Sequence, residues 1–573
     1  MFRPLVAALA VAASLVVPPA TARPAAGPAT DRAAPSAEAL VRGMSLEQKV
    51  GQLFVTSLHG QAPDEVHPGN LRDFGVGTPA EVVAKYQPGG VVYFDNDKYD
   101  NLDTPQQIAR LSNGLRQASR IPPTVATDQE MGLVTRIGPP ATQFPGNMAL
   151  GAGRSAPDAE RAAAITAREL RAMGVNQNFA PDADVNSNPA NPVIGVRSYS
   201  GDPALAAELT AAQVRGYQQP FPSRHGVSAT AKHFPGHGDT DEDSHSTLPK
   251  VDRTVEQWRA IDAPPFRAAV EAGVDSVMTA HLRLPRIDPS GEPATLSKPA
   301  IDLLRHELDF DGVVITDSLA MAGVRQLHPD AEIPVLALKA GVDQLLMPVD
   351  LGLAVDSVVA AVRSGELTER RIDQSVLRVL RVKLLRGVLT GPPVDEGAVG
   401  GSVGTPAHLA AAQAITDRTV TAVRNRSLPL KTTSALVTGW GEAPTRTLAG
   451  LLGGTALPTG DAPAEAQVAE AVQRAAEADL VVVLTNGLSA RPEQQALLTR
   501  LLAVGVPVVA VAVRNPYDVA HTAAPNWLAT YSSGAGSMAA VARVVTGEVR
   551  PTGRLPVAVP GPTPYPLGHG VTW

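Results

Sequence analysis

One stretch of the chain reads Ser228-Ala229-Thr230-Ala231-Lys232-His233-Phe234-Pro235-Gly236-His237-Gly238-Asp239-Thr240. Its beginning, 228–231, predicts a short buried strand, because small residues without charge suit the interior of a sheet. Lys232 and His233 follow at once, and the glycines after Pro235 predict a loop. The stretch therefore predicts a strand with polar side chains at its end, which is typical of sheets that build a site at their strand ends.

The same order of apolar strand, polar end and helix recurs along residues 37–390. The predicted strands are Leu53–Leu58, Gly90–Phe94, Thr124–Thr127, Val175–Ala180, Ser228–Ala231, Asp275–Ala280, Gly312–Thr316 and Val342–Met347. The amphipathic helical stretches between them include Asp158–Met173, Val255–Ala272 and Lys298–Leu308. Eight strands that alternate with helices over about 350 residues predict an α/β fold, a (β/α)₈ barrel of the TIM type, with an open doubly wound sheet as the alternative.

The positions of the polar residues favour the barrel over the open sheet. The polar residues that follow predicted strands are Asp128, Asp182, Lys232 with His233, His281 and Asp317. A closed barrel gathers the carboxyl ends of its strands around one mouth, where barrel enzymes build their active sites. We therefore expect these side chains to lie close together.

The rest of the chain predicts a smaller α/β sandwich domain with a largely parallel sheet. Residues 391–406 are typical of a linker, and a helix is expected from about His408 to Val423. The strands predicted after this helix are Ala435–Thr438, Leu480–Thr485, Val506–Val513, Leu528–Tyr531 and Leu555–Val559. Continuous apolar runs such as 506–511 suggest parallel strands that are buried on both faces. We expect the barrel to occupy 37–390 and the second domain to occupy 407–573.

The composition is that of a globular protein and excludes several classes of function. Of the 573 residues, 44% are hydrophobic and 18% are charged, which is enough apolar surface for large cores. The net charge of −7 and the pI near 6.0 argue against a nucleic-acid partner, which would require clustered Lys and Arg. The absence of cysteine excludes disulfides, thiolate catalysis and cysteine-ligated metals.

The N-terminus resembles an export signal. Arg3 precedes the apolar run Leu5–Val17, and Ala20-Thr21-Ala22 offers a cleavage site, which predicts a signal peptide over 1–22 and an Ala/Pro-rich linker over 23–36. We expect an exported protein, extracellular or associated with the cell wall, without stable membrane insertion after cleavage. An uncleaved anchor is the alternative, although the run is short for a span of ~20 residues.

Two groups of residues fit the chemistry of glycoside cleavage, which needs a carboxylate at the anomeric carbon and an acid for the leaving oxygen. Asp317 ends a strand and is the candidate nucleophile, with a helix N-cap as the alternative. Asp243 and His245 are two residues apart on a loop, so the carboxylate can orient the imidazole and favour its protonated form. A solvated acidic loop is the alternative, because Asp239, Asp241 and Glu242 lie beside them.

Further polar residues are candidates for binding a sugar. Lys232 and His233 can bind hydroxyl groups, with a buried ion pair as the alternative for the lysine. Asp128 and Arg136 lie eight positions apart and can clamp hydroxyls or an anionic group, with a surface ion pair as the alternative. Each assignment is weak alone, and the shared position at strand ends is what supports them.

Several segments together resemble glycoside hydrolase family 3, and within it the two-domain bacterial β-N-acetylglucosaminidases of the cell-wall recycling type. The matching segments are Met44–Leu53, Asp128-Gln129-Glu130, Asn178–Val185, Arg197-Ser198-Tyr199, Lys232–Thr240 with Asp243-Ser244-His245, Val277–His281, Thr316–Met321, Ala340–Asp343 and Pro551–Pro556. They extend over almost all of the expected mature chain. The run from Lys232 to His245 is the most specific of them.

The resemblance implies a fold, an activity and a set of site residues. Asp317 would form a covalent glycosyl-enzyme intermediate, and His245, held by Asp243, would be the proton donor and acceptor. The residues that would bind the N-acetylglucosamine unit are Asp128, Arg136, Arg197, Lys232 and His233. The expected activity is exo-acting, retaining hydrolysis of terminal β-linked N-acetylglucosamine from cell-wall or chitin-type oligosaccharides. No cofactor and no metal are expected, and the expected state is a monomer.

The chain departs from the family pattern at a few positions. Met131 stands where Gly is usual, and Leu133 stands where Arg is common. Val196 replaces a polar residue and Ser318 replaces a second Asp. None of these changes removes a catalytic group. Because of Met131 and Leu133, the sequence does not assign the leaving-group side of the site or any preference for muramic-acid-containing partners.

Other functions remain open at this point. A β-glucosidase or β-xylosidase of the same family would need an acid/base from the second domain, such as Glu493. Phosphorolysis is a second variant, because a histidine acid/base does not repel phosphate. A metal-dependent hydrolase would use ligands from the set His233, His237, Asp239, Asp243 and His245, although their spacing is not typical of zinc sites. A sugar-binding module without catalysis is a further alternative.

Overall fold

The computed structural model describes residues 36–220 and 225–573. The predicted signal peptide, 1–22, lies outside these residues, and so does the predicted linker up to residue 35. Within the described ranges, no helix has both the length and the apolar character that crossing a bilayer requires.

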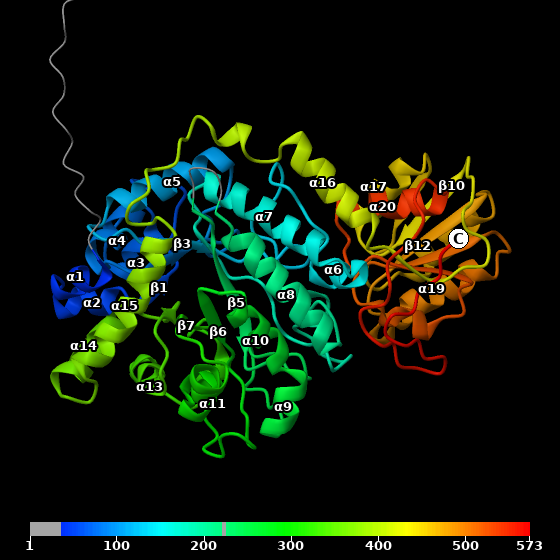
Figure 1. Cartoon of the computed structure of the whole chain (residues 1–573). Coiled ribbons are helices and arrows are strands. Elements are labelled where there is room, and N and C mark those ends of the chain that lie inside the picture. Colours follow the sequence, from blue (N-terminus) through cyan, green and yellow to red (C-terminus); the bar gives the residue numbers. More distant parts are fainter. Residues whose placement is uncertain (1–35, 221–224) are drawn as a thin grey trace, which may run out of the picture. The chain divides into compact units, whose positions relative to one another are not determined.

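Eight strands form the first sheet, in the order β7-β6-β5-β4-β3-β2-β1-β8, and every pairing in it is parallel (Figure 1). They are β1 (Phe54–Thr56), β2 (Gly90–Val92), β3 (Thr124–Thr127), β4 (Gln177–Asn178), β5 (Ser228–Phe234), β6 (Ser276–Thr279), β7 (Val313–Thr316) and β8 (Leu345–Leu346). The backbone N–H of Thr316 donates to the carbonyl of Gln344 (3.0 Å), which joins β7 to β8. The sheet therefore closes into the predicted barrel.

Helices precede, connect and follow the strands of the barrel. They are α1 (Ala37–Arg42), α2 (Leu46–Gly51), α3 (Pro68–Phe74), α4 (Pro79–Tyr86), α5 (Pro105–Gln117), α6 (Asn147–Gly153), α7 (Ala156–Ala172), α8 (Pro203–Gln218), α9 (Val255–Ile261), α10 (Ala263–Glu271), α11 (Lys298–Asp302), α12 (Ala322–Arg325), α13 (Ile333–Ala340), α14 (Leu351–Arg363) and α15 (Glu369–Leu385). The stretch expected as one helix over Val255–Ala272 is two helices that meet at Asp262. Prolines at the start of α10 explain the break, because they have no N–H to continue the first helix.

The strands of the barrel bury both of their faces. One cluster of apolar side chains contains Val55, Val92, Phe179 and Ile315 and fills the interior, with contributions from almost every strand. The alternate residues of the same strands pack with the helices in a larger cluster. This division follows from the strand geometry, in which successive side chains point to opposite faces.

The second sheet has the order β11-β10-β12-β13-β14-β9. Its strands are β9 (Thr421–Arg424), β10 (Ala435–Gly439), β11 (Thr455–Pro458), β12 (Leu480–Thr485), β13 (Val508–Ala512) and β14 (Asn526–Ala529), and only β9 is antiparallel to its neighbour. Its helices are α16 (Pro406–Asp417), α17 (Glu442–Leu451), α18 (Glu465–Ala475), α19 (Pro492–Leu502) and α20 (Ala535–Thr546). Residues of α18 and α19 pack on one face of the sheet, and residues of α17 and α20 pack on the other (Figure 1).

Two expectations for the second domain were wrong. The helix expected over His408–Val423 ends at Asp417. Thr421–Arg424 instead forms β9, which pairs with β14, because its β-branched residues favour a strand. Leu555–Val559 is not a strand, and Pro556 within it lacks the N–H that a ladder needs. The sequence also did not predict β11, whose residues are only partly buried.

A buried ion pair ties the end of α15 to the start of β6. Arg386 donates to both carboxylate oxygens of Asp275 at 2.5 and 2.8 Å, and both side chains are buried.

Arg386→Met is expected to lower the free energy of unfolding by about 3–5 kcal/mol, because Asp275 keeps an unpaired buried charge. Denaturant unfolding followed by circular dichroism measures this loss. Arg363→Met, which removes an exposed pair, is the matched control, and equal losses in the two variants would contradict the prediction.

Candidate active site

The mouth of the barrel gathers polar side chains from consecutive strands. They are Asp128 after β3, Asp182 after β4, Lys232 and His233 within β5, His281 after β6 and Asp317 after β7. In contrast to the prediction, β5 continues to Phe234 and so includes Lys232 and His233, and β4 is shorter, so that Asp182 follows it by four residues. The expectation that the strand ends meet around one mouth is confirmed.

A buried carboxylate, Glu130, holds two cations of this mouth. Arg197 donates to its two oxygens at 2.8 and 2.9 Å, and Lys232 Nζ lies 2.7 Å from Glu130 Oε1. Lys232 Nζ also lies 2.7 Å from Asp128 Oδ1. Burial opposes the charge of Glu130, but Arg197 and Lys232 hold the pKa of Glu130 below its usual range. The predicted binding residues Asp128, Arg197 and Lys232 therefore form one network of ion pairs.

Arg136 lies at the outer end of this network. Its Nη2 is 3.9 Å from Asp128 Oδ2, which is the outer limit of an ion pair, and its guanidinium lies 5.4 Å from the ring centre of Phe94. The predicted clamp of Asp128 and Arg136 is thus a loose pair. Both side chains are partly exposed, so both can reach a bound molecule.

His233 connects the ion-pair network to a second buried acid. Its Nδ1 lies 2.7 Å from Asp184 Oδ2, and its Nε2 lies 3.2 Å from Arg197 Nη2. Asp184 also accepts the backbone N–H of His237 at 2.6 Å. These contacts fix the orientation of the His233 ring and tie the loop after β5 to the loop after β4.

Asp182 differs from the other acids of the mouth. Its Oδ2 is buried without a hydrogen bond among the described residues, and it lies 3.8 Å from Arg197 Nη2. Burial, and then the nearby charge of Asp184, raise the pKa of Asp182 well above its usual range. Burial and the charge of Asp184 therefore disfavour the charged form of this side chain more than that of the other acids of the mouth.

Asp317 is held in its charged form beside two histidines. Its backbone N–H donates to Thr279 at 3.0 Å, and its Oδ1 accepts the backbone N–H of Ser318 at 2.7 Å. Burial opposes its charge, but the positive potential of His233 and His281 and the Ser318 N–H hold the pKa of Asp317 below its usual range. His281 is itself fixed, because its ring bonds to the Ser318 carbonyl at 2.9 Å. A carboxylate of this kind can attack an electrophilic carbon.

Asp243 and His245 pair with each other, as their spacing predicts. Asp243 Oδ1 accepts from the His245 ring at Nδ1 (2.7 Å) and from the His245 backbone N–H (2.9 Å). Burial works against the Asp243 charge, but these bonds hold the pKa of Asp243 below its usual range. Because a carboxylate only accepts, Nδ1 carries a proton and Nε2 is left to exchange one. The His245 side chain is 64% exposed, so Nε2 is accessible to a bound molecule.

The loop that carries this pair is anchored next to the Asp317 segment. Residues of α12, which follows Asp317, donate two backbone hydrogen bonds to it, from Ala322 to His245 O (3.3 Å) and from Gly323 to Ser244 O (3.2 Å). A Cβ on Gly323 would meet the backbone oxygen of Thr247 at 2.9 Å and that of Ser244 at 3.0 Å, so any side chain here would require the backbone to shift. The charge of His245 also contributes to the low pKa of Asp317. The structure therefore brings the two predicted catalytic groups to the same side of the mouth.

His237 supports the same loop from beneath. It is buried, its Nδ1 lies 2.9 Å from Thr240 Oγ1, and its Nε2 lies 3.0 Å from Ser244 Oγ. Burial lowers the pKa of His237 to about 4, although Asp184 raises it in part. The neutral ring thus bonds to both hydroxyls at neutral pH.

The two family departures after β3 lie in a strained turn. Met131 has a φ of +72°, a left-handed conformation that costs a non-glycine residue about 1–2 kcal/mol. This backbone explains why glycine is usual at the position. Leu133 in the same turn is 48% exposed, so the residue that replaces the common arginine reaches solvent.

Among the described residues, one cluster of side chains is close enough together to hold a metal ion. Asp182, Asp184 and His233 could share a cation by distance, and only His233 belongs to the zinc set considered from the sequence. Arg197 lies within 3.8 Å of both Asp182 and His233 and already brings a positive charge to the cluster. The donor set therefore fits a guanidinium better than a metal ion.

Glu493, the acid/base candidate of the glucosidase alternative, is exposed in the first turn of α19. No hydrogen bond or ion pair joins it to the site residues within the described ranges. Its position therefore adds no support to that alternative.

The sequence assigns no role to Glu130 and Asp184, and it places Asp182 at the mouth without assigning it a role. Each lies within a segment that resembles the family, and each follows a strand end, which was the available signal. Their roles depend on partners far along the chain: Arg197 is 67 positions from Glu130. Only the folded barrel shows that these acids hold the cations of the mouth.

Two family models match the chain. Residues 45–382 match the glycosyl hydrolase family 3 N terminal domain, and residues 380–570 match the glycosyl hydrolase family 3 C-terminal domain.

Individual proteins are also similar. Beta-hexosaminidase A of Pseudoalteromonas piscicida is 34% identical over 389 residues, which are 62% of this chain and 63% of that protein. A beta-N-acetylglucosaminidase/beta-glucosidase of Cellulomonas fimi is 30% identical over 331 residues, 56% of this chain and 58% of that protein. The matches thus cover less than two thirds of these two relatives. A solved family 3 beta-N-acetylglucosaminidase from Paenibacillus sp. str. FPU-7 has a TM-score of 0.81 at 36% identity, over 90% of this chain and 99% of that chain.

The Glu130 network makes a testable contribution to stability. Glu130→Gln preserves the shape but removes the negative charge between Lys232 and Arg197, and is expected to lower the free energy of unfolding by about 3–5 kcal/mol. Adding Lys232→Met should recover part of the loss, because one unpaired cation is then gone. Denaturant unfolding measures both variants, and Glu332→Gln, on an exposed side chain, is the control. A double variant no more stable than Glu130→Gln would contradict this account.

His237 predicts a specific pH dependence of stability. Its pKa is about 4 when folded, below the usual value of 6.5, so the unfolded chain binds the proton more readily. His237 should therefore cost stability as the pH falls from about 6.5 to about 4, and cost nothing above this window. His237→Asn is expected to flatten this part of the profile of unfolding midpoint against pH, compared with the exposed control His306→Asn. An unchanged slope in His237→Asn would refute the assignment.

Proposed function

Because this chain belongs to glycoside hydrolase family 3, we propose that it removes terminal β-linked N-acetylglucosamine from cell-wall or chitin-type oligosaccharides. The printed names of the similar proteins, β-hexosaminidase and β-N-acetylglucosaminidase, support this activity. The observation that carries the mechanism is the hydrogen-bonded pair of Asp243 and His245, on a loop anchored beside the ionised Asp317.

In the first half of the proposed reaction, an Asp317 oxygen attacks the anomeric carbon. The bond from that carbon to the leaving oxygen breaks, and its electron pair goes to this oxygen. His245 supplies the proton from Nε2, while Asp243 accepts the Nδ1 hydrogen bond and stabilises the charged ring. The product of this half is a glycosyl ester of Asp317.

In the second half, water attacks the same carbon from the side that the leaving group vacated. His245 Nε2 accepts the proton of this water, and the ester bond to Asp317 breaks. Two inversions at one carbon retain the configuration. The exposure of His245 suits this sequence, because its ring must meet first the leaving group and then water.

The residues of the ion-pair network would bind the sugar that is released. Asp128 and Lys232 present an acceptor and a donor side by side, and Arg136 lies at the outer edge. Arg197 and His233 hold each other in place deeper in the mouth. Such fixed donors and acceptors select hydroxyl and amide positions of a terminal unit, which supports an exo-acting enzyme.

We also propose that the protein works as an exported monomer, outside the cell or associated with its wall. The apolar run and cleavage pattern at residues 1–22 support export. N-terminal sequencing of the secreted chain tests this, with Arg23 as the expected first residue. An intact N-terminus in a membrane fraction would contradict it.

The catalytic roles predict a dependence on the leaving group. His245→Ala should lower kcat/KM by about 10²–10⁴-fold on a β-N-acetylglucosaminide with a poor leaving group. The loss should be much smaller on the dinitrophenyl glycoside, because that phenolate departs without a proton. Asp317→Asn should nearly abolish turnover of both substrates, because the nucleophile is gone. Initial rates at fixed pH measure these effects.

Matched controls and product analysis complete this experiment. Asp311→Asn and His306→Ala change exposed side chains away from the mouth and should retain activity. Near-wild-type turnover by purified Asp317→Asn would refute the proposal. A faster rate on the aryl glucoside would identify a β-glucosidase instead, and release of sugar 1-phosphate in phosphate buffer would identify phosphorolysis.

A further inference from the structure

One nearly buried arginine joins three separate segments of the barrel domain. Arg253 directly precedes the N-cap of α9, and its side chain is only 10% exposed. Its Nη2 lies 2.9 Å from Asp239 Oδ1 and donates to Ser187 Oγ at 2.7 Å, while its Nε lies 2.8 Å from Asp262 Oδ2. We call these four residues the Arg253 cluster.

Two members of the cluster belong to loops that follow neighbouring strands. Asp239 lies on the loop after β5 that carries the proposed acid/base pair, residues 236–249, which we call the acid/base loop. Ser187 lies on the loop after β4, and its hydroxyl donates to Asp239 Oδ1 at 2.8 Å. The guanidinium of Arg253, the hydroxyl and the carboxylate therefore all contact one another, and together they tie the acid/base loop to the loop after β4.

The remaining member of the cluster keeps the arginine in place. Asp262 lies where α9 meets α10, is 2% exposed, and packs so closely against Gly236 that a Cβ on this glycine would meet it at 2.7 Å. Burial raises the pKa of Asp262 to about 8, and the charge of Arg253 limits this rise. Arg253 thus lies between two acids, Asp262 on the wall of the barrel and Asp239 on the loop.

The cluster joins the two ends of the acid/base loop. Arg253 follows the end of the loop, and this end is fixed to the segment after β6. There the backbone N–H of Val251 donates to Arg283 O at 2.9 Å, and the N–H of Arg283 donates to Pro249 O at 2.8 Å. Asp239 lies near the start of the loop, so its contact with Arg253 closes the loop at its base.

Other anchors hold the acid/base loop from different sides. α12, which follows β7, donates two backbone hydrogen bonds to it, and His237 bonds to the hydroxyls of Thr240 and Ser244 from beneath. Residues 241 and 242, which lie between these anchors and Asp239, are exposed. The loop is therefore held by α12 on the side of β7 and by the Arg253 cluster on the side of β4.

We infer that Arg253 is a positioning residue, which holds Asp239 and so keeps the acid/base loop where His245 Nε2 can reach the leaving oxygen. Proton transfer depends steeply on distance, and a misplacement of about 1 Å can lower a rate by ~10²-fold. The inference rests on the proposed function for the role of His245. The anchoring of the loop does not depend on that function and can be measured without turnover.

The dependence on the leaving group tests whether Arg253 positions the acid. Arg253→Gln should lower kcat/KM by about ten- to a hundred-fold on a β-N-acetylglucosaminide with a poor leaving group. It should change kcat/KM little on the dinitrophenyl glycoside, which needs no proton, whereas a merely structural role would lower both values alike. Arg259→Gln, which removes an exposed pair on α9, is the matched control and should retain both activities. Equal losses on the two substrates in Arg253→Gln would overturn the inference.

Two further variants keep the test informative if Arg253→Gln folds poorly. Asp239→Ala changes a side chain that is 36% exposed, leaves Arg253 beside Asp262, and should show the same dependence on the leaving group. In the His245→Ala background, Asp239→Ala should cause no further loss on the poor substrate, because the acid is already missing. A second loss that multiplies the first would overturn the inference.

A spin label on the loop measures its anchoring without turnover. The chain contains no cysteine, so Glu242→Cys, at an exposed position of the acid/base loop, provides a single labelling site. In electron paramagnetic resonance spectra, adding Arg253→Gln should make the label more mobile, and adding Arg259→Gln should not. Unchanged mobility with Arg253→Gln would overturn the inference. Increased mobility in a protein whose His245→Ala variant loses equally on both substrates would refute only the proposed function.

Discussion

The buried carboxylate of Glu130 is the constraint on which the mouth of the barrel depends. It holds Arg197 and Lys232, which reach it from different segments, and each of these cations then positions a further group. Arg197 contacts the ring of His233, and Lys232 contacts Asp128. Two buried cations without this acid would repel each other at a high cost. The binding side of the site is thus one charge-balanced unit and not a set of independent residues.

The pair of Asp243 and His245 is positioned in a different way. Asp243 and His245 lie on a loop, and their side chains remain exposed. Their geometry comes from contacts underneath: His237 bonds to two hydroxyls of the loop, and the segment after Asp317 donates backbone hydrogen bonds to it. In the proposed reaction, the exposure of His245 would allow the same imidazole to meet the leaving sugar and then water.

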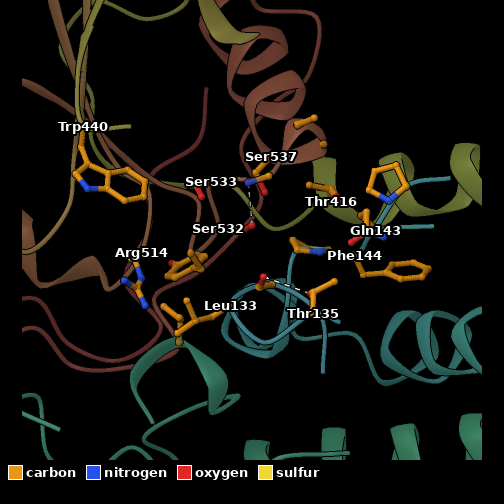
Figure 2. A pocket seen from close by; sticks show the side chains of 18 residues that line it. Leu133, Thr135, Gln143, Phe144, Thr416, Trp440, Arg514, Ser532, Ser533 and Ser537 are labelled. Carbon is orange, nitrogen blue, oxygen red and sulfur yellow. Dashed lines mark hydrogen bonds between the residues drawn. The ribbon is translucent and has the colours of Figure 1, made fainter. Parts of the chain in front are cut away.

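Two departures from the family pattern lie in a turn that faces the second domain. Met131 keeps a left-handed backbone that glycine would adopt without strain, and Leu133 of the same turn lines a cavity together with Trp440 and Arg514 (Figure 2).

The sequence by itself determined the barrel, the strand ends that carry Asp128, Lys232 and Asp317, and the pairing of Asp243 with His245. These features depend on residues that are close together in the chain. The periodicity of a strand or helix spans few residues, and two side chains that lie two positions apart on one loop can meet without the rest of the fold. Only the tertiary structure decided the partners of Glu130, the place of β9 beside β14, and the cavity that Leu133, Trp440 and Arg514 line. Each of these joins segments far apart in the chain, and burial and pairing between such segments leave no periodic pattern in the sequence.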